Sequence, residues 1–261
     1  MRHTRLLPSI AVVAVLTLTM VHAWPAGNDK AATSAAATRP ATSQPTTSRP
    51  ATTQATSAAV PPGMAIVPIK LPKPVFIGTP KNVPRSTTAD KLTGKARPPL
   101  IAPKGTTNLA LKKSVTSSEK EPIIGTLSLV TDGDKEAAEG SYVELGPGLQ
   151  WVQIDLGAAT EIYGICLWHF HADPRIYRDV VVQVADDPNF ASNVRTVFSN
   201  DQDNSAGLGI GKDREYFEMY EGKLIQAKGV QARYVRLYSQ GSTADDENHY
   251  IEVEVYGVPS K

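Results

Sequence analysis

The fold is decided by a stretch near the middle of the chain, Trp151-Val152-Gln153-Ile154-Asp155-Leu156-Gly157. Its β-branched and aromatic residues favour an extended strand. Short runs of the same kind recur along the chain at spacings of roughly 8–12 residues, which is typical of all-β domains. No segment from residue 107 onward keeps a helical period. The sequence therefore predicts a domain built from strands.

The central run is one of several expected strands. They are Leu127–Thr131, Trp151–Leu156, Ile162–Trp168, Asp179–Ala185, Arg195–Phe198, Tyr234–Tyr238 and Tyr250–Tyr256. In the last of them Ile251, Val253 and Val255 would share one face, and Glu252 and Glu254 would share the other. Strands with one apolar face pack as two antiparallel sheets. Residues 107–261 are therefore expected to form an antiparallel β-sandwich of the jelly-roll type.

Several motifs of this domain resemble one known family. They are Asn108-Leu109-Ala110-Leu111, Thr131-Asp132-Gly133-Asp134, Trp151–Gly157, Ala232–Leu237 and Ile251–Gly257. In this order they resemble the galactose-binding-like sandwich of discoidin domains (coagulation factor V/VIII C-type domains) and similar carbohydrate-binding modules. The resemblance implies a domain that binds a ligand and does not catalyse a reaction. It leaves the ligand open, because members of the family bind sugars, collagen-type proteins or phospholipids.

The resemblance also implies a structural calcium site. Calcium is held by about six to eight oxygens, with carboxylates and backbone carbonyls mixed in a tight loop. Carried over from the family, the expected ligands come from Asp132, Asp134, Leu129, Ser141, Ile251 and Glu252, with the carbonyls of Leu129, Asp134 and Ile251 taking part. The spacing alone would favour an ordinary Asp-Gly turn and a solvated strand face.

The segment after the strand Ile162–Trp168 carries candidate sugar-binding residues. Sugars are recognised by planar polar groups that pair with hydroxyls and by aromatic rings that cover their apolar faces. The family binds sugars on loops at one end of the sandwich, and the matching candidates are His169, His171, Arg175, Tyr177 and Asn204. One alternative is that these residues pack or cap turns. Another is a transition-metal site formed by the first two histidines with His249.

Two polar loops and one cysteine complete the domain. Three interpretations of the Gly-rich loop Asn200–Gly211 stay open: part of a binding surface, a second calcium site, or a solvated loop without a ligand. Ser242–His249 is a second polar loop. Cys166 is the single cysteine, so the chain forms no intramolecular disulfide. Because it lies in an apolar run, we expect it to be a small core residue and not a nucleophile.

The N-terminal part is typical of an exported protein. Arg2 and Arg5 precede the apolar run Leu6–Met20, and Val21-His22-Ala23 offers a cleavage site, so residues 1–23 are expected to be a signal peptide. An uncleaved signal anchor is the alternative. Both predict a secreted, cell-surface or periplasmic protein. Residues 24–62 are rich in Ala, Thr, Ser and Pro and predict a disordered linker. Residues 63–106, in which Pro recurs, predict an extended arm along the sandwich or a second linker.

Charge and motifs exclude several classes of function from our expectations. The chain has 27 basic and 26 acidic residues, which gives no electrostatic reason to expect nucleic acid as a partner. We see no exposed apolar spikes that would bind lipid directly, and no catalytic motif such as a nucleophile elbow or a metalloprotease His-Glu pair. The expected function is an extracytoplasmic, non-catalytic module that binds a glycan or surface glycoconjugate. The alternative is a protein-adhesion or scaffolding domain that binds a surface protein.

Overall fold

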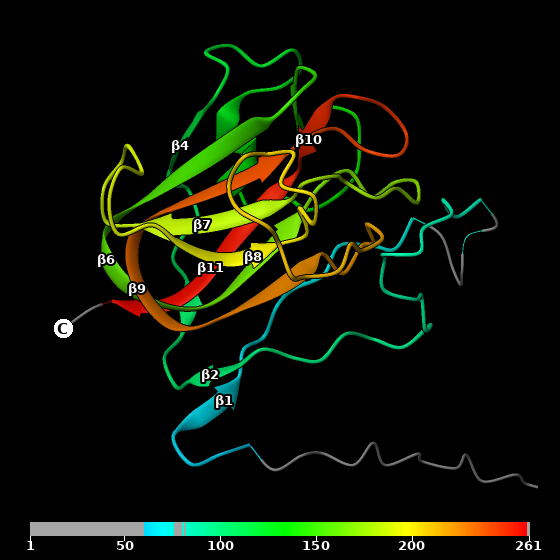
Figure 1. Cartoon of the computed structure of the whole chain (residues 1–261). Coiled ribbons are helices and arrows are strands. Elements are labelled where there is room, and N and C mark those ends of the chain that lie inside the picture. The colour runs from blue at the N-terminus through cyan, green and yellow to red at the C-terminus, as the bar shows by residue number, and fades with distance from the viewer. Residues whose placement is uncertain (1–59, 76–79, 81, 260–261) are drawn as a thin grey trace, which may run out of the picture. The chain divides into compact units, whose positions relative to one another are not determined.

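A computed structural model describes residues 60–75, 80 and 82–259 (Figure 1). The strands are β1 (Met64–Ile66), β2 (Ile101–Pro103), β3 (Thr107–Asn108), β4 (Ser114–Ser117), β5 (Val143–Leu145), β6 (Gln150–Trp168), β7 (Val181–Ala185), β8 (Arg195–Ser199), β9 (Lys223–Ser239), β10 (Asn248–Tyr250) and β11 (Glu252–Pro259). One 3₁₀ helix, η1 (Leu127–Thr131), lies among the described residues. No helix in these ranges is long and apolar enough to cross a membrane. The expected signal peptide at 1–23 and most of the expected linker at 24–62 lie outside them.

The strands form the predicted antiparallel β-sandwich. Its first layer contains β4, the N-terminal part of β6, the C-terminal part of β9, β7 and β8. Its second layer contains β3, β11, the C-terminal part of β6 and the N-terminal part of β9. The strands β6 and β9 therefore belong to both layers, and Figure 1 shows β9 curving from one to the other. Strands β5 and β10 pair separately as a two-stranded ribbon.

Two expected strands are in fact one. Trp151–Leu156 and Ile162–Trp168 are parts of β6, which stays paired with β9 through register shifts between Asp155 and Thr160 and between Ile162 and Gly164. Such bulges bend a strand without ending it. Gly157, at a φ of 90°, lies in the first shift and marks the bend.

Other boundaries also differ from the predicted ones. The run Leu127–Thr131 is the helix η1 and not a strand, because a short apolar run fits a buried helical turn equally well. The strand expected from Asp179 begins at Val181, since Asp179 has a φ of 51°. The run expected to end the domain is interrupted at Ile251, which separates β10 from β11.

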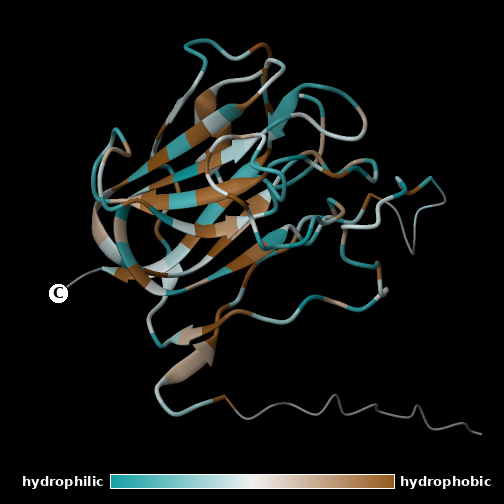
Figure 2. Ribbon diagram, in the orientation of Figure 1, coloured by the Kyte–Doolittle hydropathy of each residue, from teal (hydrophilic) through white to brown (hydrophobic). Residues whose placement is uncertain are grey.

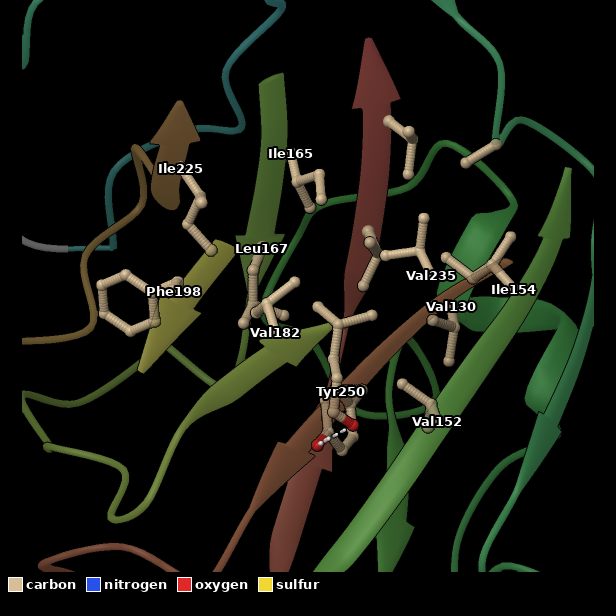
Figure 3. Close-up of a cluster of buried hydrophobic side chains, with 14 of the residues drawn as sticks. Val130, Val152, Ile154, Ile165, Leu167, Val182, Phe198, Ile225, Val235 and Tyr250 are labelled. Carbon is tan, nitrogen blue, oxygen red and sulfur yellow. Dashed lines mark hydrogen bonds between the residues drawn. The ribbon is translucent and has the colours of Figure 1, made fainter. Parts of the chain in front are cut away.

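The main core lies between the two layers. Val152 and Ile154 from the first half of β6 belong to one buried cluster with Ile165 and Leu167 from its second half (Figure 3). Full burial of such a side chain stabilises the fold by about 1.5–3 kcal/mol. Figure 2 shows the same pattern as brown segments on the strands and mostly teal or white colour on the long loops.

Within residues 63–106, the described parts 63–75 and 82–106 contribute side chains that cover the outer face of the second layer. The fully buried Leu100 packs in a second cluster with Cys166 and Trp168 of β6, and the backbone N–H of Val67 donates to the Leu100 carbonyl at 2.8 Å. Strands β1 and β2 pair antiparallel within this segment. We refer to residues 63–106 as the arm.

The arm explains why β11 is buried on both faces. Glu252 lies opposite Trp168 and Glu254 opposite Cys166, so both glutamates share the covered face with these side chains. Glu252 is fully buried and Glu254 nearly so, which corrects the solvated strand face that spacing alone would favour. Cys166 is buried, as predicted, and burial raises the pKa of its thiol well above the ordinary value.

Candidate metal loop and binding groove

The expected calcium residues gather where η1 ends against the start of β11. We call residues Asp132–Lys135 the metal loop. The N–H of Gly133 donates to Glu252 Oε2 at 3.1 Å, which ties the loop to the last strand. The N–H of Asp134 donates to Asp132 Oδ1 at 2.8 Å and closes a tight turn. Gly133 has a φ of 93°, which side-chain-bearing residues rarely adopt.

Glu252 is a buried carboxyl group that is only partly satisfied by hydrogen bonds. Its side chain is fully buried, and its Oε1 has no hydrogen-bond partner. Burial raises the pKa of Glu252 to about 9, and the negative charges of Glu254 and Asp132 act in the same direction. A buried carboxyl oxygen without a partner is costly, so this atom points to a missing ligand.

A lysine that the sequence analysis did not identify lies beside this carboxylate. Lys135 Nζ contacts Glu254 Oε1 at 2.8 Å, and it donates to the Gly133 carbonyl at 3.3 Å. Both side chains are only 7% exposed, so they form a buried ion pair. Lys135 pairs directly with Glu254 and acts on Glu252 from farther away, and no ion pair among the described residues involves Asp132 or Glu252.

Asp132 and Glu252, once a bound cation displaces the Glu252 proton, would match the charge of a divalent cation. The donor set is entirely oxygen, as calcium prefers, and it would include Asp132 and Glu252 with nearby loop carbonyls. Ser141 Oγ donates to Asp134 Oδ2 at 3.2 Å, so these two expected residues lie together. The Leu129 carbonyl accepts the Asp132 N–H at 3.5 Å, and the Ile251 N–H donates to the Trp168 carbonyl. The residues present therefore fit calcium.

Three of the expected sugar-binding side chains lie inside the domain. His169 is fully buried, contacts Glu218 Oε1 at 2.7 Å through Nδ1, and stacks on the Tyr177 ring at 4.2 Å. His171 Nε2 is 2.9 Å from the Lys135 carbonyl oxygen, and the Tyr177 hydroxyl is 3.0 Å from Nδ1 of His249. These side chains stabilise the loops and do not face solvent, which corrects their expected position on a binding surface.

The other two candidates have different surroundings. Arg175 is buried and forms ion pairs with Asp173 and Asp245, both at 2.9 Å, so it joins two loops. Asn204 is exposed at a φ of 62°, and its Oδ1 accepts the N–H of Gly209 at 2.7 Å, so it shapes the Gly-rich loop. The five candidates do not form one surface site.

A surface groove lies next to these loops. It consists of two adjoining hollows of about 590 and 460 Å³, both lined by Thr88, Arg178 and Glu215. The first hollow is completed by Pro84, Arg85, Ser86, Thr87, Ile176 and Thr243. The second is completed by Asp179, Asn200, Gln202, Asp203, Ser205 and Gln240. We call the two hollows the loop groove. Its walls present guanidinium, carboxylate, amide and hydroxyl groups.

Carboxylates at one end of the loop groove shape the loop itself. Carboxylate oxygens of Asp179, Asp201 and Asp203 lie within 4.8 Å of one another. They surround Ser205, whose N–H donates to Asp201 at 2.9 Å and whose hydroxyl donates to Asp179 at 2.9 Å. Burial raises the pKa of Asp179, and the neighbouring charges of Asp201 and Asp203 also raise it.

The sequence indicates one loop of this groove but does not identify most of the residues that line it. The polar, Gly-rich composition of Asn200–Gly211 indicated a functional loop, and Asp203 lies within it. Arg178 and Glu215 carry no such signal, because they stand in ordinary polar surroundings. The contribution of the arm depends on contacts between residues more than 120 positions apart, which no local pattern predicts.

No protein-family model matches the chain, and no curated protein matches it. Solved structures with a similar fold include a chitosan-binding module of a chitosanase/glucanase from Paenibacillus sp. (22% identity, 58% of this chain, 99% of that chain, TM-score 0.41). A fucose-binding module from Streptococcus pneumoniae is similar (20% identity, 57% of this chain, 97% of that chain, TM-score 0.40). A family 89 glycoside hydrolase from Clostridium perfringens matches at 19% identity and TM-score 0.43 over 59% of this chain, which spans 15% of that enzyme. At these scores the likeness carries no conclusion about ligand or chemistry.

Proposed function

We propose that the chain is an extracytoplasmic, non-catalytic module that binds carbohydrate through the loop groove. The observation that carries this proposal is the groove itself, because its size lies within the range of small-ligand sites. Its hydroxyl, amide and charged side chains are the groups that pair with sugar hydroxyls. The extracytoplasmic location rests on the sequence pattern of residues 1–23.

The hydrogen bonds of the groove carboxylates support binding without catalysis. Asp203, which lines the second hollow, accepts the backbone N–H of Ser205 in its own loop at 3.0 Å. Glu215 accepts hydroxyls from Ser86 and Thr88. Because these carboxylates hold loops in place, we propose that the groove binds its ligand and leaves it unchanged.

We further propose that calcium binds the metal loop and has a structural role. The partnerless Oε1 of Glu252 and the contact between the metal loop and this buried carboxyl support this assignment. Bound there, the ion would neutralise its carboxylate ligands and hold the metal loop against β11. Asp132 and Glu252 are its expected carboxylate ligands.

Binding to a glycan array followed by calorimetry on the best ligand tests the carbohydrate proposal. Arg178→Ala should weaken binding about tenfold, since it removes a charged donor shared by both hollows. Arg195→Ala is the matched control. Arg178 and Arg195 are 47% and 40% exposed, and each lies 3.6 Å from an aspartate, but Arg195 does not line the groove.

Two outcomes would contradict the proposal. If no glycan binds, the carbohydrate assignment fails, and a surface protein captured by the intact groove but not by the Arg178→Ala variant would favour the adhesion role. If a glycan binds but both arginine variants bind it as well as the parent chain, the ligand site lies elsewhere.

A further inference from the structure

The arm crosses the loops that form the groove. Ala89 forms a parallel β-bridge with Glu215, and the N–H of Asp90 donates to the Glu215 carbonyl at 2.8 Å. Arg214 Nη2 donates to the Ala89 carbonyl at 2.9 Å, and Arg214 Nε pairs with Asp90 at 3.1 Å. Backbone and side-chain contacts thus fix this part of the arm to one loop of the sandwich.

One carboxylate organises the preceding turn of the arm. Glu215 Oε2 accepts the hydroxyls of Ser86, at 2.9 Å, and of Thr88. Ser86 Oγ in turn accepts the N–H groups of Thr88 at 3.1 Å and of Ala89 at 2.9 Å. The side chain of Glu215 therefore sets the position of Ser86–Ala89 above the sandwich.

The arm supplies a wall of the groove as a result. Five consecutive residues, Pro84–Thr88, line the first hollow opposite Ile176, Arg178 and Thr243. Thr88 also lines the second hollow, so the boundary between the hollows is made partly by the arm. Arg85 is exposed, and as a guanidinium it presents several hydrogen-bond donors.

We propose that Pro84–Thr88 is part of the ligand site and that the site takes an oligosaccharide of more than one unit. Arg85 and Thr88 contact the ligand, and Glu215 is a positioning residue that holds them over the groove. Two hollows that share Thr88, Arg178 and Glu215 provide adjoining subsites for consecutive sugar units. This inference rests on the proposed carbohydrate-binding function.

Calorimetry on the whole chain tests the inference. The ligands are three tetrasaccharides of different charge: a neutral galacto-oligosaccharide, an acidic mannuronate oligosaccharide and a cationic chitosan oligosaccharide. The affinity of each tetrasaccharide is compared with that of its monosaccharide. For the best of the three, the tetrasaccharide should bind at least about tenfold more tightly than the monosaccharide. Arg85→Ala should weaken tetrasaccharide binding about tenfold. Lys95→Ala removes an exposed positive charge of the arm that does not line the groove, and it should have no effect.

Variants of Glu215 separate positioning from folding. Glu215→Ala should weaken tetrasaccharide binding about fivefold to tenfold, whereas Glu215→Gln, which keeps an oxygen acceptor for Ser86 and Thr88, should restore most of it. In the parent chain, hydrogen exchange of residues 84–90 should slow when the tetrasaccharide binds, which a purely structural role of the arm would not produce.

The failures of the two proposals are distinguishable. A parent chain that binds none of the sugars overturns both. A parent chain that binds a sugar while Arg85→Ala and Glu215→Ala bind it equally well overturns only the role of the arm. Equal affinity for monosaccharide and tetrasaccharide overturns the oligosaccharide site and leaves a single sugar as ligand.

Discussion

The metal loop and the loop groove both concentrate charge, but they do so in opposite ways. At the metal loop the ion pair of Lys135 and Glu254 is removed from water, and Oε1 of the buried Glu252 has no hydrogen-bond partner. In the groove, charges stay close to solvent, and the Arg178 guanidinium lies 3.6 Å from Asp246 with about half of its side chain exposed. Buried charges interact strongly and exposed ones weakly. The metal loop should therefore control stability, and the groove should control affinity.

The largest effect is expected at the buried ion pair of the metal loop. Glu254→Gln removes the charge that neutralises Lys135 and leaves the ammonium buried without a counter-charge. Breaking such a pair costs about 3–5 kcal/mol of unfolding free energy. Urea unfolding measures the loss, with Glu139→Gln, an exposed glutamate near the same loop, as the control. A loss below about 1 kcal/mol would show that the pair is effectively solvated.

Calcium should have the next largest effect. An ion at a hundred times its dissociation constant stabilises the fold by about 2.7 kcal/mol. For a domain of this size that raises Tm by about 5–10 °C over the value in excess chelator. Thermal unfolding of Asp132→Ala and of Glu252→Gln should show no such rise. A parent chain whose Tm is the same with calcium and with chelator would contradict the assignment of calcium to the metal loop.

The smallest effect is expected at an exposed pair on the bend of β6. Arg233 binds both oxygens of Asp155, at 2.7 and 2.8 Å, and holds the pKa of Asp155 below its ordinary value. A lowered pKa means that the stabilisation is complete above the unfolded pKa of about 3.9 and is lost as pH falls through the folded one. Asp155→Asn should cost less than about 1 kcal/mol at pH 7, and progressively less as the pH falls below the unfolded pKa. A larger loss at pH 7 would weaken the contrast between buried and exposed charges.

Much of the fold followed from the sequence because local patterns determine strands. Alternation and turn residues predicted the strands that build the two layers, and the buried Cys166 followed from its apolar run. The expected strand at Leu127–Thr131 was wrong, because a short run with three apolar residues fits a helical turn as well. The burial of Glu254 was also missed, since it depends on an arm distant in sequence that covers this face of β11.

Some residues of the two candidate sites could also be predicted from the sequence, and others could not. The family resemblance implied that Asp132 and Glu252 lie near each other, and Gly133, next to Asp132, donates its N–H to Glu252. His169 and Tyr177 had suitable side chains for sugar binding, but residue type does not reveal burial, and both lie in the interior. Arg178 and Glu215 acquire their place only when loops and arm meet, so no local signal marks them.

The sharing of β6 and β9 between the layers has a consequence for how the domain unfolds. Each of these strands runs through both sheets, so neither layer can separate without breaking the backbone ladder of the other. Layers joined in this way should lose their structure together, in a single cooperative transition. Amide protons at the centres of β6 and β9 are then expected to exchange only through global opening, and to be the slowest in the molecule.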